Sequence, residues 1–352
     1  VTALSLRTVR DPIQDAIRAS AETFVDARTM SDDELFQWIR DQEVDVLVDC
    51  CGFTAMNRNT VISRRPAPVQ AHYLGYPGTV GAALVDYQLT VRARDPVGTE
   101  SNYDEALAFL PETFVAVDEL PRPRELPERE DFGIPTDRPV LGFLGAHYRI
   151  EPGVWAAWRT ILQRCPDAVL VLRGGPGRPQ LEAHAEAAGF RDRVIFTPDA
   201  LLTKAWHQVM LDLYLDTFRV TAGTGGIITA FSGVPIVTVR GGKPESRTGA
   251  AVLEAAGLPE LVLDSPEGYV ERVVELVRGG GLADLRREVA RRRAHAPLFH
   301  PERFARTMEN AFEEMWQRAL AGERPESFDV KAPEGARSAP RSAPPVHAFA
   351  GS

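Results

Sequence analysis

One segment of the sequence has the residue types expected of a phosphate-binding loop. Residues 221–226 read TAGTGG and lie between an apolar run that predicts a strand and a run that predicts a helix. Glycines let the backbone amides at a helix N-terminus approach anionic oxygens closely. The same composition also suits an ordinary turn between a strand and a helix, so the segment alone leaves both interpretations open.

Several other polar residues stand at the ends of predicted strands. Asp49 and Asp86 each flank an apolar run, and they could form a general-base pair only if the fold brought them together. His72 and His147 also lie at strand ends. We expect His72 to pack in a structural role, whereas His147 is left open between a structural hydrogen bond and a contact with a ligand.

The elements that must position these residues alternate between strand and helix in the first third of the chain. Asp11 and Pro12 open one helical pattern, and Ser31 opens a second one as a predicted N-cap. Repeated strand–helix units favour a doubly wound α/β domain with a parallel sheet. The predicted strands are residues 1–6, 22–27, 44–50, 85–90 and 107–111, and the predicted helices are residues 11–21 and 31–42.

A segment rich in proline and charge, residues 118–137, predicts the boundary to a second α/β series. We therefore expect domains at residues 1–130 and 131–325, and a disordered tail at 326–352. Parallel sheets of this kind bind ligands at the carboxyl ends of their strands, so a cleft between the domains is the expected site. The second series has predicted strands at 140–146, 168–174, 194–198, 213–217 and 235–239, and predicted helices at 151–165, 180–189, 203–212, 226–233, 266–278, 282–294 and 301–321.

Composition excludes several classes of function. The net charge of −9 argues against a nucleic-acid-binding protein, which needs a basic surface. No apolar run reaches the ~18 residues of a membrane span, and no signal peptide opens the chain, so we expect a cytoplasmic protein without a membrane partner. The three cysteines, Cys50, Cys51 and Cys165, lack metal-binding spacing, so no metal site is predicted. The first residue, Val1, already lies in a predicted strand, so we expect the sequence to begin inside a domain.

Residues 65–87, RPAPVQAHYLGYPGTVGAALVDY, carry a specific resemblance. This segment resembles the first-domain motif of the O-GlcNAc transferase family, which includes the SPINDLY proteins. Neighbouring blocks are also similar to that family, in the same order from Val1 to Arg324. They read LVDCCGFTAMNR, NYDEALAFLPETF, LYLDT, SGVPIVTVRGGKPESR and PLFHPERFARTMENAFEEMW. The resemblance implies a GT-B fold of two Rossmann-like domains.

The resemblance also implies a function. It is the metal-independent and inverting transfer of a sugar, GlcNAc or a related one, from a nucleotide-sugar to Ser or Thr hydroxyls of a protein. UDP-GlcNAc is the expected donor, and no other cofactor is implied. Arg149 stands where the family has its catalytic lysine, and arginine keeps the charge that a diphosphate requires. The implied nucleotide-sugar-binding residues are Thr221, Gly223, Thr224, Gly225, Gly226, Lys204, His147 and Arg247. The implied sugar and acceptor loop is Leu74, Gly75, Tyr76, Pro77, Gly78 and Thr79.

The sequence departs from the family pattern at several positions. Gly225 replaces a threonine, Ile228 replaces the carboxylate that binds ribose, and Ala146 replaces a glutamine. The family's G-N-H-P-T segment would precede Val1, and its tetratricopeptide repeats do not occur in this sequence. These departures support a competing hypothesis, a degenerate glycosyltransferase-like module that binds without turnover. A two-domain epimerase of similar architecture would not explain RPAPVQ and LGYPGT together.

Overall fold

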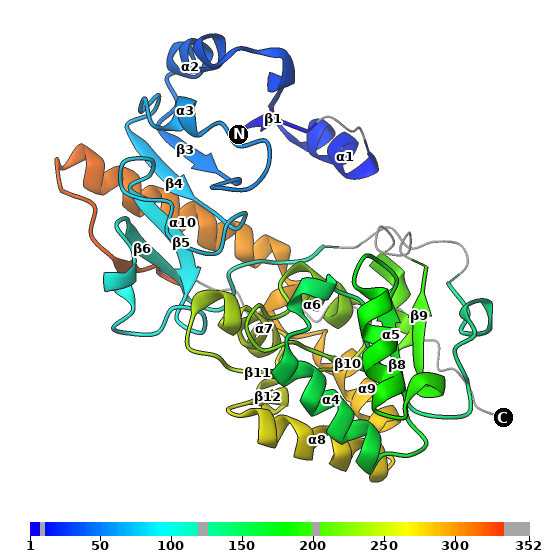
Figure 1. Ribbon diagram of the computed structural model, residues 1–352. Coiled ribbons are helices and arrows are strands. Elements are labelled where there is room, and N and C mark those ends of the chain that lie inside the picture. The colour runs from blue at the N-terminus through cyan, green and yellow to red at the C-terminus, as the bar shows by residue number, and fades with distance from the viewer. Residues whose placement is uncertain (8–10, 119–125, 199–204, 334–352) are drawn as a thin grey trace. The chain divides into compact units, whose positions relative to one another are not determined.

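The computed structural model describes residues 1–7, 11–118, 126–198 and 205–333 (Figure 1). The chain divides into two compact units. The first comprises residues 1–92, 96–114 and 306–333, and the second comprises residues 93–95 and 115–305. Each unit contains its own parallel sheet, so the mixed α/β class expected from the sequence is confirmed.

The bounds of the two units differ from those of the expected domains at 1–130 and 131–325. It leaves the first unit at residue 114 and returns to it at residue 306, within helix α10 (Pro301–Leu320). The expected tail also needs correction in its first part, because Phe328–Asp329 forms strand β13. The Phe328 ring packs edge-on against Tyr87, with centroids 5.8 Å apart, which anchors this strand on the sheet. Residues 334–352 of the expected tail lie outside the described residues.

The sheet of the first unit follows the chain in one direction. Its order is β13-β6-β5-β4-β3, with all neighbours parallel. Strands β1 and β2 form a separate parallel pair. The bounds are β1 (Thr2–Ser5), β2 (Thr23–Asp26), β3 (Val46–Asp49), β4 (Val69–His72), β5 (Tyr87–Val91) and β6 (Ala106–Leu110).

Local sequence signals explain where the helices of the first unit begin. The Asp11 side chain accepts a hydrogen bond from the Gln14 amide at 2.8 Å and caps α1 (Pro12–Ser20). Ser31 and Glu34 form the reciprocal capping box of α2 (Asp32–Asp41). The short helix α3 (Asn59–Ile62) follows β3. Both predicted N-caps are therefore confirmed.

The sheet of the second unit has the order β12-β11-β10-β7-β8-β9. In chain order this is the doubly wound Rossmann arrangement, in which the direction of winding reverses between β7 and β10. Such a reversal opens a crevice at the carboxyl ends of the two strands, where ligands bind. The bounds are β7 (Val140–Phe143), β8 (Val169–Arg173), β9 (Val194–Thr197), β10 (Leu213–Leu215), β11 (Ile236–Val239) and β12 (Val262–Leu263).

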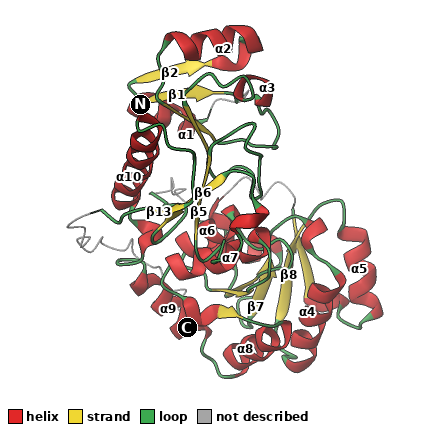
Figure 2. Cartoon of the chain, turned by 90° about the vertical axis from the view of Figure 1, so that its left-hand side faces the viewer, coloured by secondary structure: helices red, strands yellow, loops and turns green. Residues whose placement is uncertain are grey.

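Helices cover this second sheet (Figure 2). They are α4 (Pro152–Arg164), α5 (Arg178–Ala187), α6 (Thr224–Phe231), α7 (Pro244–Ala255), α8 (Pro266–Arg278) and α9 (Leu282–Arg292). Helix α7 was not expected, and the predicted helix at 203–212 is instead a 3-10 helix, η7 (Ala205–Met210), in its described part. The other 3-10 turns are η1 (Ala27–Thr29), η2 (Glu100–Asn102), η3 (Glu130–Phe132), η4 (His147–Arg149), η5 (Arg191–Arg193), η8 (Pro259–Leu261) and η9 (Pro297–Phe299).

Two properties of the described residues bear on function. None of the helices formed by these residues combines the length and the apolar character that a membrane crossing requires. In the same part of the chain, no group of three or more His, Cys, Asp and Glu side chains is arranged to hold a metal ion.

Candidate functional site

Arg149 lies just beyond β7, at the point where the second sheet reverses direction. Its side chain is 12% exposed. Nε donates a hydrogen bond to the Val220 carbonyl oxygen at 2.7 Å, and Nη2 lies 3.7 Å from Asp216 Oδ1. That distance is too long for a hydrogen bond, and Nη2 is buried without an acceptor among the described residues. The site therefore holds a largely buried cation with unused hydrogen-bond donors.

Asp216 shapes the loop that follows β10. This fully buried carboxyl accepts hydrogen bonds from the Thr217 amide at 2.8 Å, the Ala222 amide at 2.9 Å and the Thr238 hydroxyl at 2.8 Å. Burial raises the pKa of Asp216, although the nearby Arg149 and the three hydrogen bonds oppose that rise. Asp216 thus ties both ends of the loop to the sheet and faces Arg149.

The N-terminus of α6 follows this loop and is not capped by a side chain. Gly223 occupies the N-cap position without a side-chain hydrogen bond, and Thr224 is exposed. The first amide of this helix with a backbone acceptor is that of Ile227, which donates to Gly223, and the amides of Thr224, Gly225 and Gly226 have no acceptor within the described residues. A Cβ atom at Gly223 or Gly225 would approach other protein atoms no closer than 3.6 Å and 3.7 Å, so internal packing does not require these glycines. Three amides without a protein acceptor therefore lie at this helix end beside the exposed Thr224 hydroxyl, although Gly226 itself is buried, and such a helix end suits an anion.

Thr221 differs from its neighbours in the loop. Its hydroxyl donates to the Glu245 carbonyl oxygen at 3.1 Å and accepts from the Gly249 amide at 2.9 Å. Both partners belong to α7, and Thr221 is buried. The hydroxyl therefore holds the loop against α7, and a contact between Thr221 and a ligand stays a prediction.

His147 is also engaged by the protein backbone. Its Nε2 lies 2.8 Å from the Arg173 carbonyl oxygen, and its Nδ1 lies 3.1 Å from the Gly177 amide nitrogen. A neutral ring that carries its proton on Nε2 satisfies both contacts. His147 therefore joins the ends of β7 and β8. These contacts favour the structural role for His147 over a contact with a ligand.

The remaining two predicted nucleotide-sugar-binding residues lie outside the contacts of Arg149. Arg247 on α7 donates from Nε to the Ala93 carbonyl oxygen at 3.0 Å and from Nη1 to the Gly241 carbonyl oxygen at 3.1 Å. Lys204 lies outside the described residues. The structure thus brings together Arg149, Asp216 and the loop, while the ligand contacts of Arg247 and Lys204 stay predictions.

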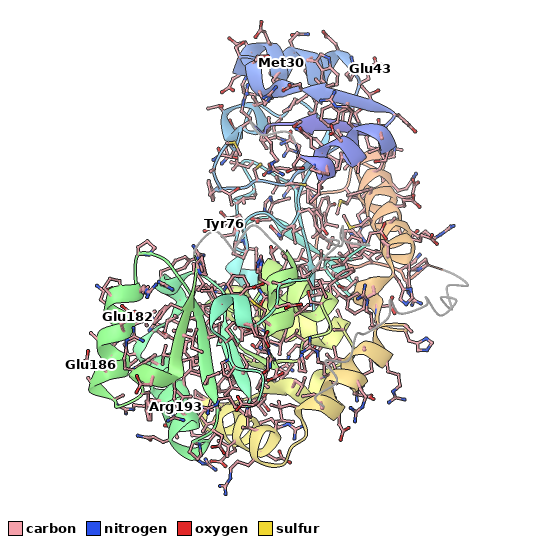
Figure 3. The ribbon with its side chains drawn as sticks, turned by 90° about the vertical axis from the view of Figure 1, so that its right-hand side faces the viewer. Met30, Glu43, Tyr76, Glu182, Glu186 and Arg193 are labelled. Atoms are coloured by element: carbon pink, nitrogen blue, oxygen red, sulfur yellow. The ribbon has the colours of Figure 1, made fainter. Side chains whose placement is uncertain are left out.

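In the first unit, the predicted sugar and acceptor loop at residues 74–79 has an unusual backbone. Leu74 adopts a left-handed conformation with φ of 71°, and the residue is 41% exposed. Gly75 passes so close to the backbone of Cys50 that an added Cβ would lie 2.1 Å from the Cys50 carbonyl oxygen. Tyr76, labelled in Figure 3, stacks edge-on with Phe53, with centroids 5.4 Å apart. Close approach of the two backbones therefore explains the first glycine of the LGYPGT motif, Gly75.

Carboxylates anchor both sides of this loop. Buried Glu105 accepts hydrogen bonds from the Thr79 hydroxyl at 2.6 Å, the Val80 amide at 2.9 Å and the Gly81 amide at 3.2 Å. At the other side, Asp49 lies 3.2 Å from the ring of His72. The structural role expected for His72 agrees with this contact.

Asp49 and Asp86, which the sequence left as a general-base pair only if the fold brought them together, have different partners. Asp49 lies beside His72, whereas Asp86 pairs with Arg65 at 2.6 Å and accepts from the Gln70 amide at 2.8 Å.

A cavity of about 1140 Å³ lies between α4 and α5. Its lining includes His147, Tyr148 and Trp155, but neither Arg149 nor any residue of the 221–226 loop. The cavity is therefore distinct from the candidate phosphate site, although η4 contributes to both.

Sequence reasoning missed the two carboxylates that shape the loops, Asp216 and Glu105. The signal for Asp216 was its place directly after an apolar strand in LYLDT, where the polar group of a parallel strand faces the ligand edge. Glu105 lies in the NYDEALAFLPETF block, but nothing local to it indicates which loop it would hold.

Comparisons with known proteins agree with this geometry. The sequence matches Glycosyl transferase family 41 over residues 8–120 and 115–308. It is 30% identical over 326 residues to the probable UDP-N-acetylglucosamine–peptide N-acetylglucosaminyltransferase SEC of Arabidopsis thaliana, and 31% identical over 296 residues to the probable SPINDLY enzyme of Oryza sativa. These alignments cover 89% and 82% of this chain, but only 33% and 32% of the two relatives. The chain thus spans about a third of their length.

Similarity extends to a solved structure. An O-GlcNAc transferase mutant from Thermobaculum terrenum superposes with a TM-score of 0.80 and 27% identity, covering 91% of this chain and 62% of that one. The match confirms the expected GT-B class of fold. The motifs, the doubly wound second sheet and these comparisons lead to one conclusion: the chain belongs to glycosyl transferase family 41.

Proposed function

We propose that this chain is the catalytic part of a protein O-glycosyltransferase. It would transfer GlcNAc or a related sugar from a nucleotide-sugar, with UDP-GlcNAc as the expected donor, to Ser or Thr hydroxyls of a protein acceptor. Family membership supports the class of reaction, and the names of the relatives support the donor and the peptide acceptor. The structural observation that carries the proposal is Arg149, whose Nη2 has no acceptor among the described residues and whose side chain contacts the loop that leads to the uncapped N-terminus of α6.

The chemistry of sugar transfer explains why such a site is useful. When the sugar leaves, negative charge develops on the diphosphate, and fixed donors that face this charge lower the barrier. Arg149 would neutralise part of the charge, and the free amides of α6 would donate hydrogen bonds to the phosphate oxygens. Asp216 would hold Arg149 and the loop in place before the donor binds. In the first unit, the 74–79 loop would contribute to the sugar and acceptor side.

The departures from the family pattern concern affinity more than chemistry. Ile228 cannot accept hydrogen bonds from ribose hydroxyls, and the loss of such a contact costs about 1–3 kcal/mol. Gly225 lacks a hydroxyl but keeps its amide. The donor site would therefore bind the nucleoside more weakly than a site with the carboxylate, while its phosphate contacts persist. The degenerate-module hypothesis is less favoured, because the family match extends across both units.

Calorimetric titration with UDP, UDP-GlcNAc, GDP and CMP tests the donor site. We expect saturable binding of UDP and UDP-GlcNAc, and a loss of affinity of roughly tenfold or more in Arg149→Ala. Arg287→Ala is a matched control, because Arg287 is an exposed arginine on α9 that pairs only with a nearby aspartate, Asp284, among the described residues. Binding of no nucleotide by a folded sample would contradict the proposal.

A second measurement separates the enzyme from the binding module. The chain is incubated with UDP-GlcNAc and an acceptor protein, and mass spectrometry detects O-linked sugar on Ser or Thr. Transfer that Arg149→Ala strongly reduces and Arg287→Ala leaves intact supports the enzyme. Tight UDP binding with neither transfer to an acceptor nor hydrolysis of the donor supports the module instead.

A further inference from the structure

A histidine–aspartate pair joins the ends of two neighbouring strands in the first unit. Asp49 ends β3 and His72 ends β4, and the two residues are partners in the strand register. His72 is fully buried, and its Nδ1 lies 3.2 Å from Asp49 Oδ2. An ionised carboxylate only accepts hydrogen bonds, so Nδ1 carries a proton in this contact. The second ring nitrogen is then directed away from Asp49.

That second nitrogen contacts the backbone of the 74–79 loop. His72 Nε2 lies 3.0 Å from the Tyr76 carbonyl oxygen and 3.3 Å from the Tyr76 amide nitrogen. It donates to the carbonyl when it carries a proton and accepts from the amide when it does not. In either state, His72 fixes the position of Tyr76 relative to β4.

Asp49 fixes the preceding turn at the same time. Its carboxylate accepts from the Cys51 amide at 3.0 Å and from the Gly52 amide at 2.7 Å. A Cβ at Gly52 would lie 2.9 Å from the His72 ring and 2.6 Å from the Tyr76 side chain. The two turns are therefore packed directly against each other, and one buried pair holds both.

The segment between His72 and Tyr76 is strained. Leu74 has a φ of 71°, in the left-handed region that a residue with a side chain adopts only under strain. Such a conformation persists only where surrounding contacts enforce it, and it occurs most often at functional sites. The contacts that bracket Leu74 include the hydrogen bond from the Gly75 amide to the Tyr73 carbonyl oxygen at 2.9 Å, the His72 contact with Tyr76 and the close approach of Gly75 to Cys50.

We propose that His72, oriented by Asp49, is a positioning residue that holds Leu74 in its strained conformation and thereby fixes the 74–79 loop for sugar transfer. The inference rests on the proposed function for its catalytic consequence, although the structural part stands on the contacts alone. His72 acts through the loop backbone and touches no substrate in this scheme.

Two substitutions of similar size separate the two contacts of the ring. Asparagine at position 72 places its amide near the former Nδ1 and keeps a group for Asp49, but it does not reach Tyr76. Glutamine places its amide near the former Nε2 and keeps the contact with Tyr76. We expect His72→Asn to lower kcat by roughly tenfold to a hundredfold, because a misplaced loop disturbs the alignment of the reactants. We expect His72→Gln to stay within about threefold of the unaltered chain.

The affinity for UDP is the internal control, because the proposed nucleotide contacts belong to the second unit. Both variants should bind UDP as the unaltered chain does. A His72→Asn variant with unchanged kcat would overturn the inference. Equal losses in both variants, accompanied by loss of UDP binding, would assign His72 to general folding and would also overturn it.

Hydrogen exchange tests the inference without any activity. Amides of residues 73–79 should exchange faster in His72→Asn than in His72→Gln or the unaltered chain. Leu74→Gly removes the strain, since glycine adopts positive φ freely, so the effect of His72→Asn on exchange should shrink in that background. An equal effect in both backgrounds would contradict the role of strain. If the unaltered chain transfers no sugar, the proposed function fails, and the exchange result still decides the role of His72.

Discussion

In each of the two units, an aspartate at the end of a parallel strand holds the loop that follows that strand. Asp216 follows β10 in the second unit, and Asp49 ends β3 in the first. Each carboxylate accepts two backbone amides from the loop after its strand and faces one basic side chain. The partner is Arg149 in one case and His72 in the other.

Burial makes the two aspartates respond differently to pH. Burial raises the pKa of Asp216, since its opposing contacts do not make up for the complete loss of water. Burial also disfavours the charged form of Asp49, but the hydrogen bonds from His72, Gly52 and Cys51 outweigh it and leave the pKa of Asp49 below its ordinary value. The surroundings of Asp216 therefore disfavour its charged form, whereas the surroundings of Asp49 favour its charged form.

The largest expected effect concerns the basic partner in the second unit. Arg149→Ala should lower the transfer rate by about a hundredfold to a thousandfold, the usual cost of losing a donor to developing charge. Arg149→Lys keeps the charge and should retain more activity than alanine, but less than arginine because the forked geometry is lost. Steady-state kinetics with UDP-GlcNAc and a protein acceptor measure both. If Arg149→Ala lowered the transfer rate no more than His72→Asn does, the two basic partners would not differ in the roles assigned to them, charge stabilisation for Arg149 and loop positioning for His72.

A second prediction tests the cost of the buried charge. Every group around Asp216 donates a hydrogen bond, so Asp216→Asn must turn its own NH2 group toward a donor. We expect a loss of about 1–3 kcal/mol in the free energy of unfolding, measured with urea. Asp284→Asn, an exposed substitution on α9, is the control.

The pH dependence of that loss has a defined sign. Because the folded-state pKa of Asp216 is raised, its contribution is complete below the ordinary value of 3.8 and declines as the pH rises through the folded pKa. The stability gap between the unaltered chain and Asp216→Asn should therefore narrow as the pH rises. A gap that widened would show that Arg149 dominates over burial.

Asp49 should show the opposite trend. Its folded-state pKa is lowered, so its contribution is present above the ordinary value of 3.8 and is lost as the pH falls through the folded pKa. We expect Asp49→Asn to cost about 1–2 kcal/mol near neutral pH, with a gap that shrinks on acidification. Urea unfolding at several pH values measures it. Parallel trends in Asp49→Asn and Asp216→Asn would remove the contrast between the units.

The sequence predicted those parts of the molecule that depend on local pattern. The N-caps Asp11 and Ser31 and the helix at 266–278 required only neighbouring residues, and the structure contains all three. Helix α7 escaped prediction because Gly249 in its interior weakens the helical signal and its N-cap, Lys243, is not a residue type that marks a helix start. Strand β13 escaped because its pairing with β6 joins residues far apart in the chain.

In the candidate site too, the features encoded by local sequence were predicted, and those that depend on contacts between distant residues were not. Arg149 and the glycine-rich loop were found by their motifs, which are contiguous in the sequence. The link between Asp216 and Arg149, the anchoring of Thr79 by Glu105 and the positive φ of Leu74 arise only when separate strands come together. No spacing in the sequence encodes such contacts, because each depends on the order of strands in the sheet.

The smallest expected effect distinguishes two threonines of the second-unit loop. Thr221 is buried between the loop and α7, whereas Thr224 is exposed at the first turn of α6. Thr224→Ala should weaken UDP binding by about twofold to tenfold, the value of one hydrogen bond, without a change in stability. Thr221→Val should do the reverse, with a stability loss of about 1 kcal/mol and little effect on UDP affinity. Calorimetry and urea unfolding on the two variants measure both quantities. If Thr221→Val weakened UDP binding more than Thr224→Ala, the loop would present its buried hydroxyl to the donor, and the assignment of α6 as the phosphate-binding end would be wrong.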